Sequence, residues 1–181
     1  VWHRDVNQSY VLLGFPTDQV IGTKAEYALD LLSIILGEGR SSRLHRRLND
    51  ELGIVSSVSS SFWNLAHAGL FMLEAVTPPE KVKEVETEFQ TALNHLRESI
   101  RPEELQKAKK MIHADYDFTN EKAISIANTY GHSRVLASIR HTIHYLEEID
   151  KITLDDLSTV IDTYVDTKKQ CKGILLPKQN A

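Results

Sequence analysis

Apolar residues recur every three or four positions in several stretches of the chain. This period covers residues 23–36, 41–52, 82–99, 102–116 and 153–164, and it appears in patches over 121–148. Each stretch predicts an amphipathic helix. Gly37 and Gly39 are expected to end the first helix and Gly53 the second, since a residue without a Cβ turns the chain easily. Ser41 is the expected cap of the second helix.

Two of the later helices begin with a stronger signal. Thr77-Pro78-Pro79-Glu80 matches a capping box with proline in the first turn, and Thr153 stands three residues before Asp156 in a similar arrangement. In a capping box the side chains at the two ends satisfy each other's backbone N–H groups. These motifs predict firm starts for the helices over 82–99 and 153–164.

Shorter apolar runs lie between the helical stretches. Residues 8–15 form one run that ends at Pro16 and suits a strand buried on both faces, while 54–62 and 69–76 predict an antiparallel pair joined by a loop over 64–68. Residues 173–176 predict a closing strand. This order of elements favours an α+β fold, a two-layer sandwich with a mostly antiparallel sheet and helices packed on one face.

Composition sets the class of protein. The chain has 181 residues, of which 41% are hydrophobic and 25% charged, so residues 1–181 are expected to form a single globular domain. A net charge of −4 argues against a nucleic-acid partner. No apolar run is long enough for a transmembrane segment. We expect a soluble protein of the bacterial cytoplasm or periplasm, or of an organelle, and the start at Val1 suggests a piece of a longer chain.

The search for catalytic chemistry finds no complete motif. Cys171 is the only cysteine, which excludes an internal disulfide, and its place in the closing strand suggests a small buried hydrophobe. His141, His144 and Glu148 would share one helix face, but an inverted zinc-protease helix requires H-x-x-E-H and the fifth position here is Glu148. We therefore expect a polar helix face, no metal ligand and no catalytic residue in this chain.

The segment from Gly37 to Arg43 reads Gly-Glu-Gly-Arg-Ser-Ser-Arg and could offer backbone N–H groups to an anion. It lacks the lysine and the glycine spacing of a phosphate-binding loop, so a glycine turn followed by a serine cap is the competing interpretation. Four arginines follow closely, at positions 40, 43, 46 and 47, and a solvated helix face accounts for most of them.

Leu36-Gly-Glu-Gly-Arg-Ser-Ser-Arg-Leu44 and its continuation over 47–54 resemble a known family, the zinc metallopeptidases of the pitrilysin and insulinase type. The resemblance is greatest to the branch that contains the mitochondrial processing peptidases. Residues 8–15 and 103–109 also resemble this family, so the similarity extends over nearly the whole chain.

The resemblance implies a domain that lacks zinc and works beside a zinc-bearing domain or subunit of the same family. Zinc would be the cofactor of the parent enzyme, with none in this chain, and a peptide substrate would lie in a chamber between two halves, pairing with a sheet edge as an added strand. Arg47 aligns with a substrate-binding arginine of the family, and Ser42 and Arg43 are further candidate substrate contacts. The tyrosine that accompanies this arginine is absent, because Ile54 or Ser56 stands in its place.

Three functions stay open at this level. The chain is the non-zinc domain of an active peptidase, from either the zinc-bearing or the partner half. It is otherwise a catalytically inactive assembly or interaction domain of the same fold, as in the non-catalytic core subunits of respiratory complexes. An anion-binding domain that uses residues 37–43 is the third.

Overall fold

The computed structural model describes residues 1–65, 67–136 and 138–178. Five strands form one sheet in the order β1-β5-β2-β4-β3. Their bounds are β1 Trp2–Arg4, β2 Ser9–Thr17, β3 Ser57–Asn64, β4 Gly69–Thr77 and β5 Cys171–Pro177. Every pairing is antiparallel except β1 with β5, which is parallel. The α+β fold with a mostly antiparallel sheet is thus confirmed, although β1 was not predicted.

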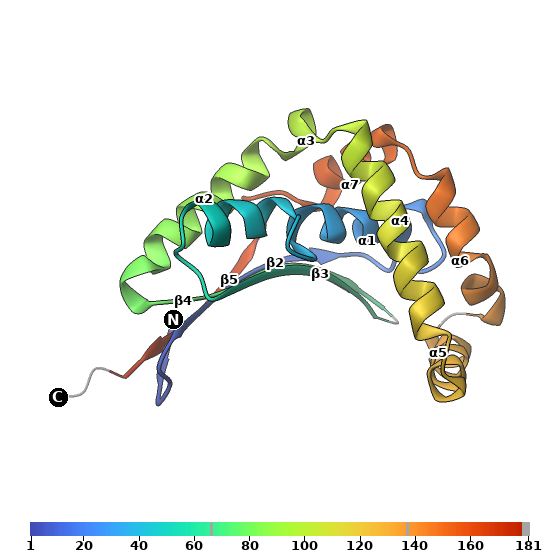
Figure 1. The fold of residues 1–181 in the computed structure, drawn as a ribbon, viewed down its shortest axis with the longest axis horizontal. Coiled ribbons are helices and arrows are strands. Elements are labelled where there is room, and N and C mark those ends of the chain that lie inside the picture. Colours follow the sequence, from blue (N-terminus) through green and yellow to red (C-terminus); the bar gives the residue numbers. More distant parts are fainter. Residues whose placement is uncertain (66, 137, 179–181) are drawn as a thin grey trace.

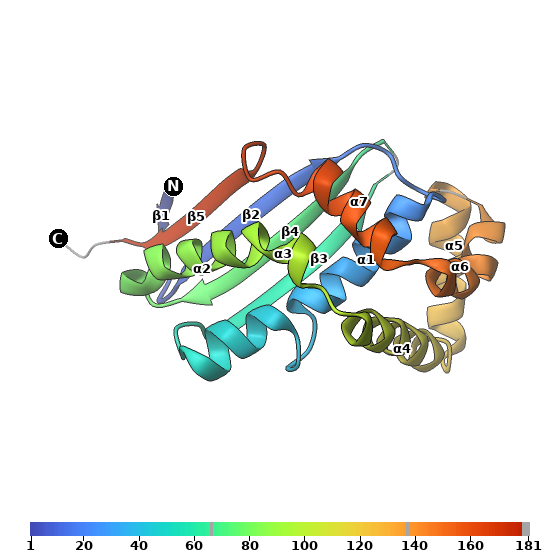
Figure 2. The ribbon, with the colours of Figure 1, turned by 90° about the horizontal axis from the view of Figure 1, so that it is seen from above.

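Helices cover one face of the sheet and leave the other face open (Figure 1). The α-helices are α1 Lys24–Gly37, α2 Val82–Asn94, α3 Leu96–Ser99, α4 Pro102–Thr119, α5 Ala123–Leu136, α6 Ile139–Lys151 and α7 Leu154–Tyr164. A π-helix, η1, spans His45–Glu51, and a 3₁₀ turn, η2, spans Pro79–Lys81. Seen from the helix side, α2, α1 and α7 lie over the strands, with α4, α5 and α6 grouped toward one end (Figure 2). No helix of the described ranges is both long and apolar enough to cross a lipid bilayer.

Alternation along β2 explains why only one face is covered. Val11, Leu13 and Phe15 are buried, whereas Tyr10 and Pro16 are exposed. Since successive side chains of a strand point to opposite faces, the apolar set joins the helices in the core. The expectation of a strand buried on both faces is therefore wrong, and Pro16 lies within the strand instead of ending it.

Two helix starts differ from the sequence expectation. The Thr77 hydroxyl donates to the Ile54 carbonyl at 2.6 Å, so it ties β4 to the chain before β3 and caps no helix. Ser41 likewise does not cap the second helix. The Arg46 N–H donates to the Ser42 carbonyl, so the first turn begins one residue later, and the Ser41 hydroxyl accepts from Lys107 instead. By contrast, the capping box of Thr153 and Asp156 is formed as predicted.

Candidate functional site

The glycine turn connects the end of α1 to η1 and lies against β3. A Cβ on Gly37 would lie 2.2 Å from the Ser60 backbone nitrogen, so only glycine allows α1 to approach β3 this closely. Gly39 has φ +76 and Gly53, after η1, has φ +61, both in the left-handed region. Gly39 and Gly53 thus occupy left-handed turns at the two ends of this segment, and Gly37 occupies a point of close approach between α1 and β3.

Ser42 and Arg43 make their hydrogen bonds within the domain. The buried Ser42 hydroxyl donates to the Gly39 carbonyl at 2.8 Å and holds the turn. Arg43 donates to both carboxylate oxygens of Glu104 on α4, at 2.8 and 2.6 Å. It also donates to the hydroxyl and the carbonyl of Ser99 on α3, each at 2.6 Å. The substrate role of these two residues stays a prediction, and in the structure Ser42 holds the turn while Arg43 joins the start of this helical segment to α3 and α4.

Arg47 lies on the surface between η1 and α2. It donates to both carboxylate oxygens of Glu88, at 2.9 and 3.1 Å, and to Glu51 at 3.0 Å. The hydrogen bonds to Glu88, and then to Glu51, raise the pKa of the guanidinium further above its usual range. Arg43 and Arg47 both line a hollow of about 230 Å³ between these two helices. Three of the five N–H donors of Arg47 have a partner among the described residues.

The two positions that could replace the family tyrosine are placed differently. Ile54 is buried at 3% exposure and belongs to the core. Ser56 is exposed and donates to the Gln8 side chain and to the Val76 carbonyl. Neither side chain is a phenol, so this domain has no tyrosine donor at that place.

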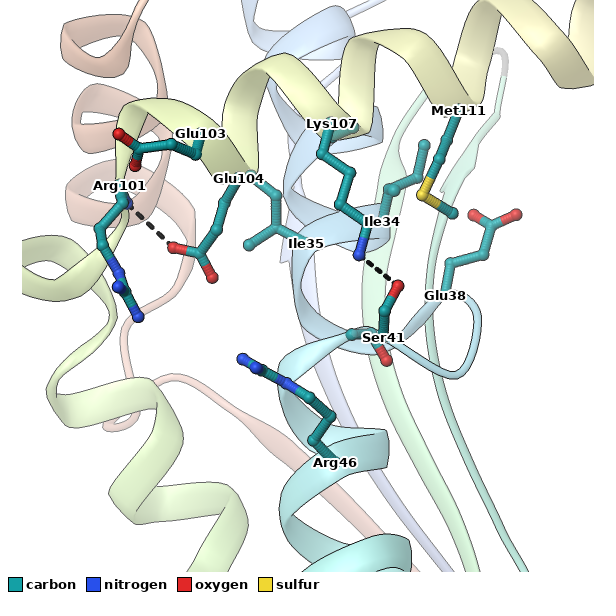
Figure 3. A pocket seen from close by; sticks show the side chains of 12 residues that line it. Ile34, Ile35, Glu38, Ser41, Arg46, Arg101, Glu103, Glu104, Lys107 and Met111 are labelled. Atoms are coloured by element: carbon teal, nitrogen blue, oxygen red, sulfur yellow. Dashed lines mark hydrogen bonds between the residues drawn. The ribbon is translucent and has the colours of Figure 1, made fainter.

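A cavity of about 320 Å³ lies on the other side of the glycine turn, between α1, η1 and α4 (Figure 3). Arg46, Arg101 and Lys107 line it together with Ser41 and Glu38. The Lys107 ammonium donates to the Ser41 hydroxyl across the cavity. Sequence reasoning grouped Arg46 with its neighbours as a solvated face and missed Arg101 and Lys107, because only the packing of α4 beside the turn brings them there.

The residues of the histidine motif do not converge. His141 contacts Glu26 of α1 at 2.8 Å, His144 contacts Glu147, and Lys151 donates to Glu148. Among the residues that the structure describes, no group of three or more histidine, cysteine or acidic side chains is suited to hold a metal ion. Cys171 is in β5 as predicted, but it is exposed, which corrects the expectation of a buried side chain.

Sequence reasoning also missed an acidic group between α1 and α6. The Tyr145 hydroxyl donates to Asp30 at 2.7 Å. Desolvation there raises the pKa of Asp30 to about 7, and the negative charge of Glu26 adds to this effect. No sequence motif marks the pair, which is 115 residues apart.

The open face of the sheet carries exposed aromatic side chains. Trp2, Tyr10 and Trp63 are 58%, 46% and 56% exposed. The strand register places all three on the helix-free face. Tyr10 and Trp2 both pair with Leu175, so they lie on the same side of the sheet. Trp63 pairs with Leu70, which pairs with Pro16 on the Tyr10 side of β2. A hollow of about 250 Å³ lies across β2, β3 and β4, and its lining includes Tyr10, Ser57, Ser59 and Glu74.

Comparison with known proteins assigns the family. The family model described as the Peptidase M16 inactive domain matches residues 1–112, more than half of the chain. The zinc protease PqqE of Helicobacter pylori is 28% identical over 180 residues, which cover 98% of this chain and 40% of that protein. The chain therefore spans less than half the length of this curated relative.

Solved structures agree with this assignment. A crystal structure of a protease from Helicobacter pylori has a TM-score of 0.89 and 27% identity, covering 97% of this chain and 42% of that one. The structure of an inactive peptidase domain from Bordetella parapertussis has a TM-score of 0.82 at 18% identity and covers 99% of this chain and 98% of that one. The resemblance to the pitrilysin type is confirmed, and the chain belongs to the M16 peptidase family as an inactive domain of its zinc proteases.

Proposed function

We propose that residues 1–181 form the non-zinc domain of a longer M16 zinc peptidase. A companion domain of the same family would bind the zinc, and this domain would form part of the chamber wall and contact the peptide substrate. The observation that carries the proposal is the open sheet face, which exposes Trp2, Tyr10 and Trp63 with no helix over them. Exposed apolar surface of this kind is typical of an interaction site.

We assign the zinc to the companion domain because the described residues of this chain offer no suitable ligand set. The described residues contain no cluster of three metal-binding side chains. His141, the best candidate by sequence, is only 16% exposed and contacts the carboxylate of Glu26. A tetrahedral zinc site needs three or four ligands that converge on one point. No step of peptide hydrolysis is therefore assigned to a side chain of this domain.

The sheet can contact a peptide in two ways. Its open face presents the hollow with the hydroxyls of Ser57 and Ser59 and the carboxylate of Glu74. Among the residues that the structure describes, the outer strand β3 pairs with β4 alone, so the other edge of β3 has backbone groups that an extended peptide could pair with. Arg47 would add a contact beyond the start of this strand, through the two donors that Glu88 and Glu51 leave unused.

The full-length protein provides the test. We expect it to hold zinc and to cleave an unstructured peptide, and we expect the double variant Tyr10→Ser, Trp63→Ser to cleave it several-fold more slowly at unchanged zinc content. Phe118→Ser is the matched control, because Phe118 is 72% exposed on α4, away from the open sheet face. Equal turnover of both variants and the parent protein would refute substrate contact at this face.

The assembly domain is the second candidate, and the same experiment separates the two. The exposed aromatic face would then bind a companion domain instead of a substrate. Two results together would establish this alternative. The full-length protein would hold no zinc and cleave no peptide, and the double variant of Tyr10 and Trp63 would lose association with its companion.

A further inference from the structure

The cavity beside the glycine turn combines three different surfaces. It measures about 320 Å³, near the lower end of the roughly 300–1,000 Å³ typical of small-ligand sites. Cationic side chains come from η1, from α4 and from its N-cap Arg101, apolar ones come from α1 and α4, and carboxylates come from Glu38 of the turn and from Glu103 and Glu104 of α4. Figure 3 shows these groups around one space, with Glu38 beside Met111 and the arginines toward the other end.

The two carboxylates of α4 line the cavity, but in the described ranges neither forms an ion pair with Arg46, Arg101 or Lys107. Arg46 and Arg101 form no ion pair with any residue in the described ranges, and Lys107 contacts only the neutral Ser41 hydroxyl. In Figure 3 the Arg46 side chain points toward the side of the cavity where Arg101 and Glu104 lie. Bringing like charges together is unfavourable unless an anion joins them, and a guanidinium fork matches a carboxylate well.

Glu104 does not supply that anion, although it lines the cavity. Both of its oxygens accept from Arg43, and one accepts from the Arg101 backbone N–H. Burial acts to raise the pKa of Glu104, but the hydrogen bonds from Arg43 and from the Arg101 backbone, together with the positive charges of Arg43 and Arg101, lower it overall, so the group is an anion held mainly by Arg43.

The remaining lining selects among anions. Ile34, Ile35, Ala108 and Met111 form an apolar wall, which inorganic phosphate would not use. Glu38 makes no hydrogen bond with a described residue and can accept one from a ligand N–H, which a fatty acid does not possess. A carboxylate, an apolar side chain and an N–H donor occur together at the C-terminal end of a peptide.

We propose that this cavity binds the free C-terminus of a peptide with an apolar last residue. Arg46 and Arg101 bind the carboxylate, with Lys107 beside them. The last side chain packs against Ile35 and Met111, and Glu38 accepts the backbone N–H. The cavity lies on the helix side of the domain, so this site is separate from the open sheet face and does not depend on zinc.

Calorimetric titration of the full-length, zinc-free protein tests the proposal without cleavage of the probe. The probe is a short N-acetylated peptide ending in leucine, used once with a free C-terminus and once as its amide. We expect the free acid to bind, and the amide to bind at least tenfold more weakly, since hydrogen bonds to a charged group are among the strongest. Arg46→Ala should weaken the free acid by about tenfold, and Arg46→Lys by less, because a point charge cannot form the fork.

Arg140→Ala is the matched control, because Arg140 is an exposed arginine of α6 outside the cavity. It should leave the affinity for the free acid unchanged. If the Arg46→Ala protein does not fold, Arg101→Gln serves as the second variant, and it should weaken binding of the free acid by a similar factor. Equal binding of acid and amide, no effect of either cavity variant, or inorganic phosphate that binds as tightly as the peptide would overturn the proposal. Loss of peptide cleavage in the sheet-face variant would not bear on it.

Discussion

Arg43 gives the sharpest test of how the glycine turn segment is built. Its guanidinium makes four hydrogen bonds that join the residues just before η1 to Glu104 of α4 and to Ser99 of α3. The Arg43→Ala variant removes all four and leaves Glu104 with the Arg101 backbone N–H alone. We expect this single change to destabilise the domain more than any other arginine substitution in the segment.

The magnitude follows from the burial of the pair. The Arg43 and Glu104 side chains are 18% and 22% exposed, between the cases of a surface and a buried ion pair. An exposed pair contributes about 0.2–1 kcal/mol, and breaking a buried one costs about 3–5 kcal/mol. We therefore expect a loss of about 2–3 kcal/mol in the free energy of unfolding. For a chain of this length this corresponds to a fall of about 4–12 °C in Tm.

Thermal unfolding followed by circular dichroism measures this loss, with Arg47→Ala as the matched control. Arg47 is 49% exposed and its ion pairs lie in solvent, so its removal should leave Tm almost unchanged. If Arg47 contacts substrate, the same variant in the complete enzyme should lower peptide turnover by about tenfold or more. A Tm of Arg43→Ala within 1 °C of the parent would refute the reasoning, as would a larger fall for Arg47→Ala than for Arg43→Ala.

Three further changes test the core, the turn and the acidic group. Phe89→Ala should cost about 3–5 kcal/mol in urea unfolding, because Phe89 is 0% exposed; a loss below about 1 kcal/mol would contradict its place in the core. Gly37→Ala should destabilise the fold by about 1–3 kcal/mol, because the added Cβ would clash with β3. Gly131→Ala, whose Cβ would lie in open space on α5, should stabilise it slightly. Equal effects of the two changes would contradict the close approach of α1 to β3 at Gly37. Burial raises the pKa of Asp30 to about 7, so the folded protein binds a proton there that the unfolded chain releases, and the free energy of unfolding should fall as the pH rises from about 4 to 7. The Asp30→Asn variant should therefore be stabilised relative to the parent more at pH 8 than at pH 5, as measured by urea midpoints. A stabilisation that is the same at both pH values would refute the shift.

Signals that are local in sequence predicted most of the fold. The helical period, the capping box at Thr153 and the hairpin of 54–76 each depend on residues within a few positions of one another, and each corresponds to an observed element. Strand β1 carried no such signal. Its three residues are all exposed, and its only pairing is with β5, more than 160 residues away in the chain.

The arginines at positions 43, 46 and 47 show why the candidate site could not be predicted in the same way. Sequence reasoning treated them as one basic patch, but Arg43 and Arg47 line the hollow toward α2 while Arg46 lines the cavity beside α4. Their partners Glu104 and Glu88 are 61 and 41 residues away, so the chemistry of each arginine is decided by which helix packs next to it. The local pattern also predicted an ordinary α-helix where a π-helix forms, with the Leu52 N–H bonded to the Arg47 carbonyl five residues back. Because π-helical turns are rare and are frequently found at functional sites, this departure adds support to the proposal that residues of η1 contact a ligand.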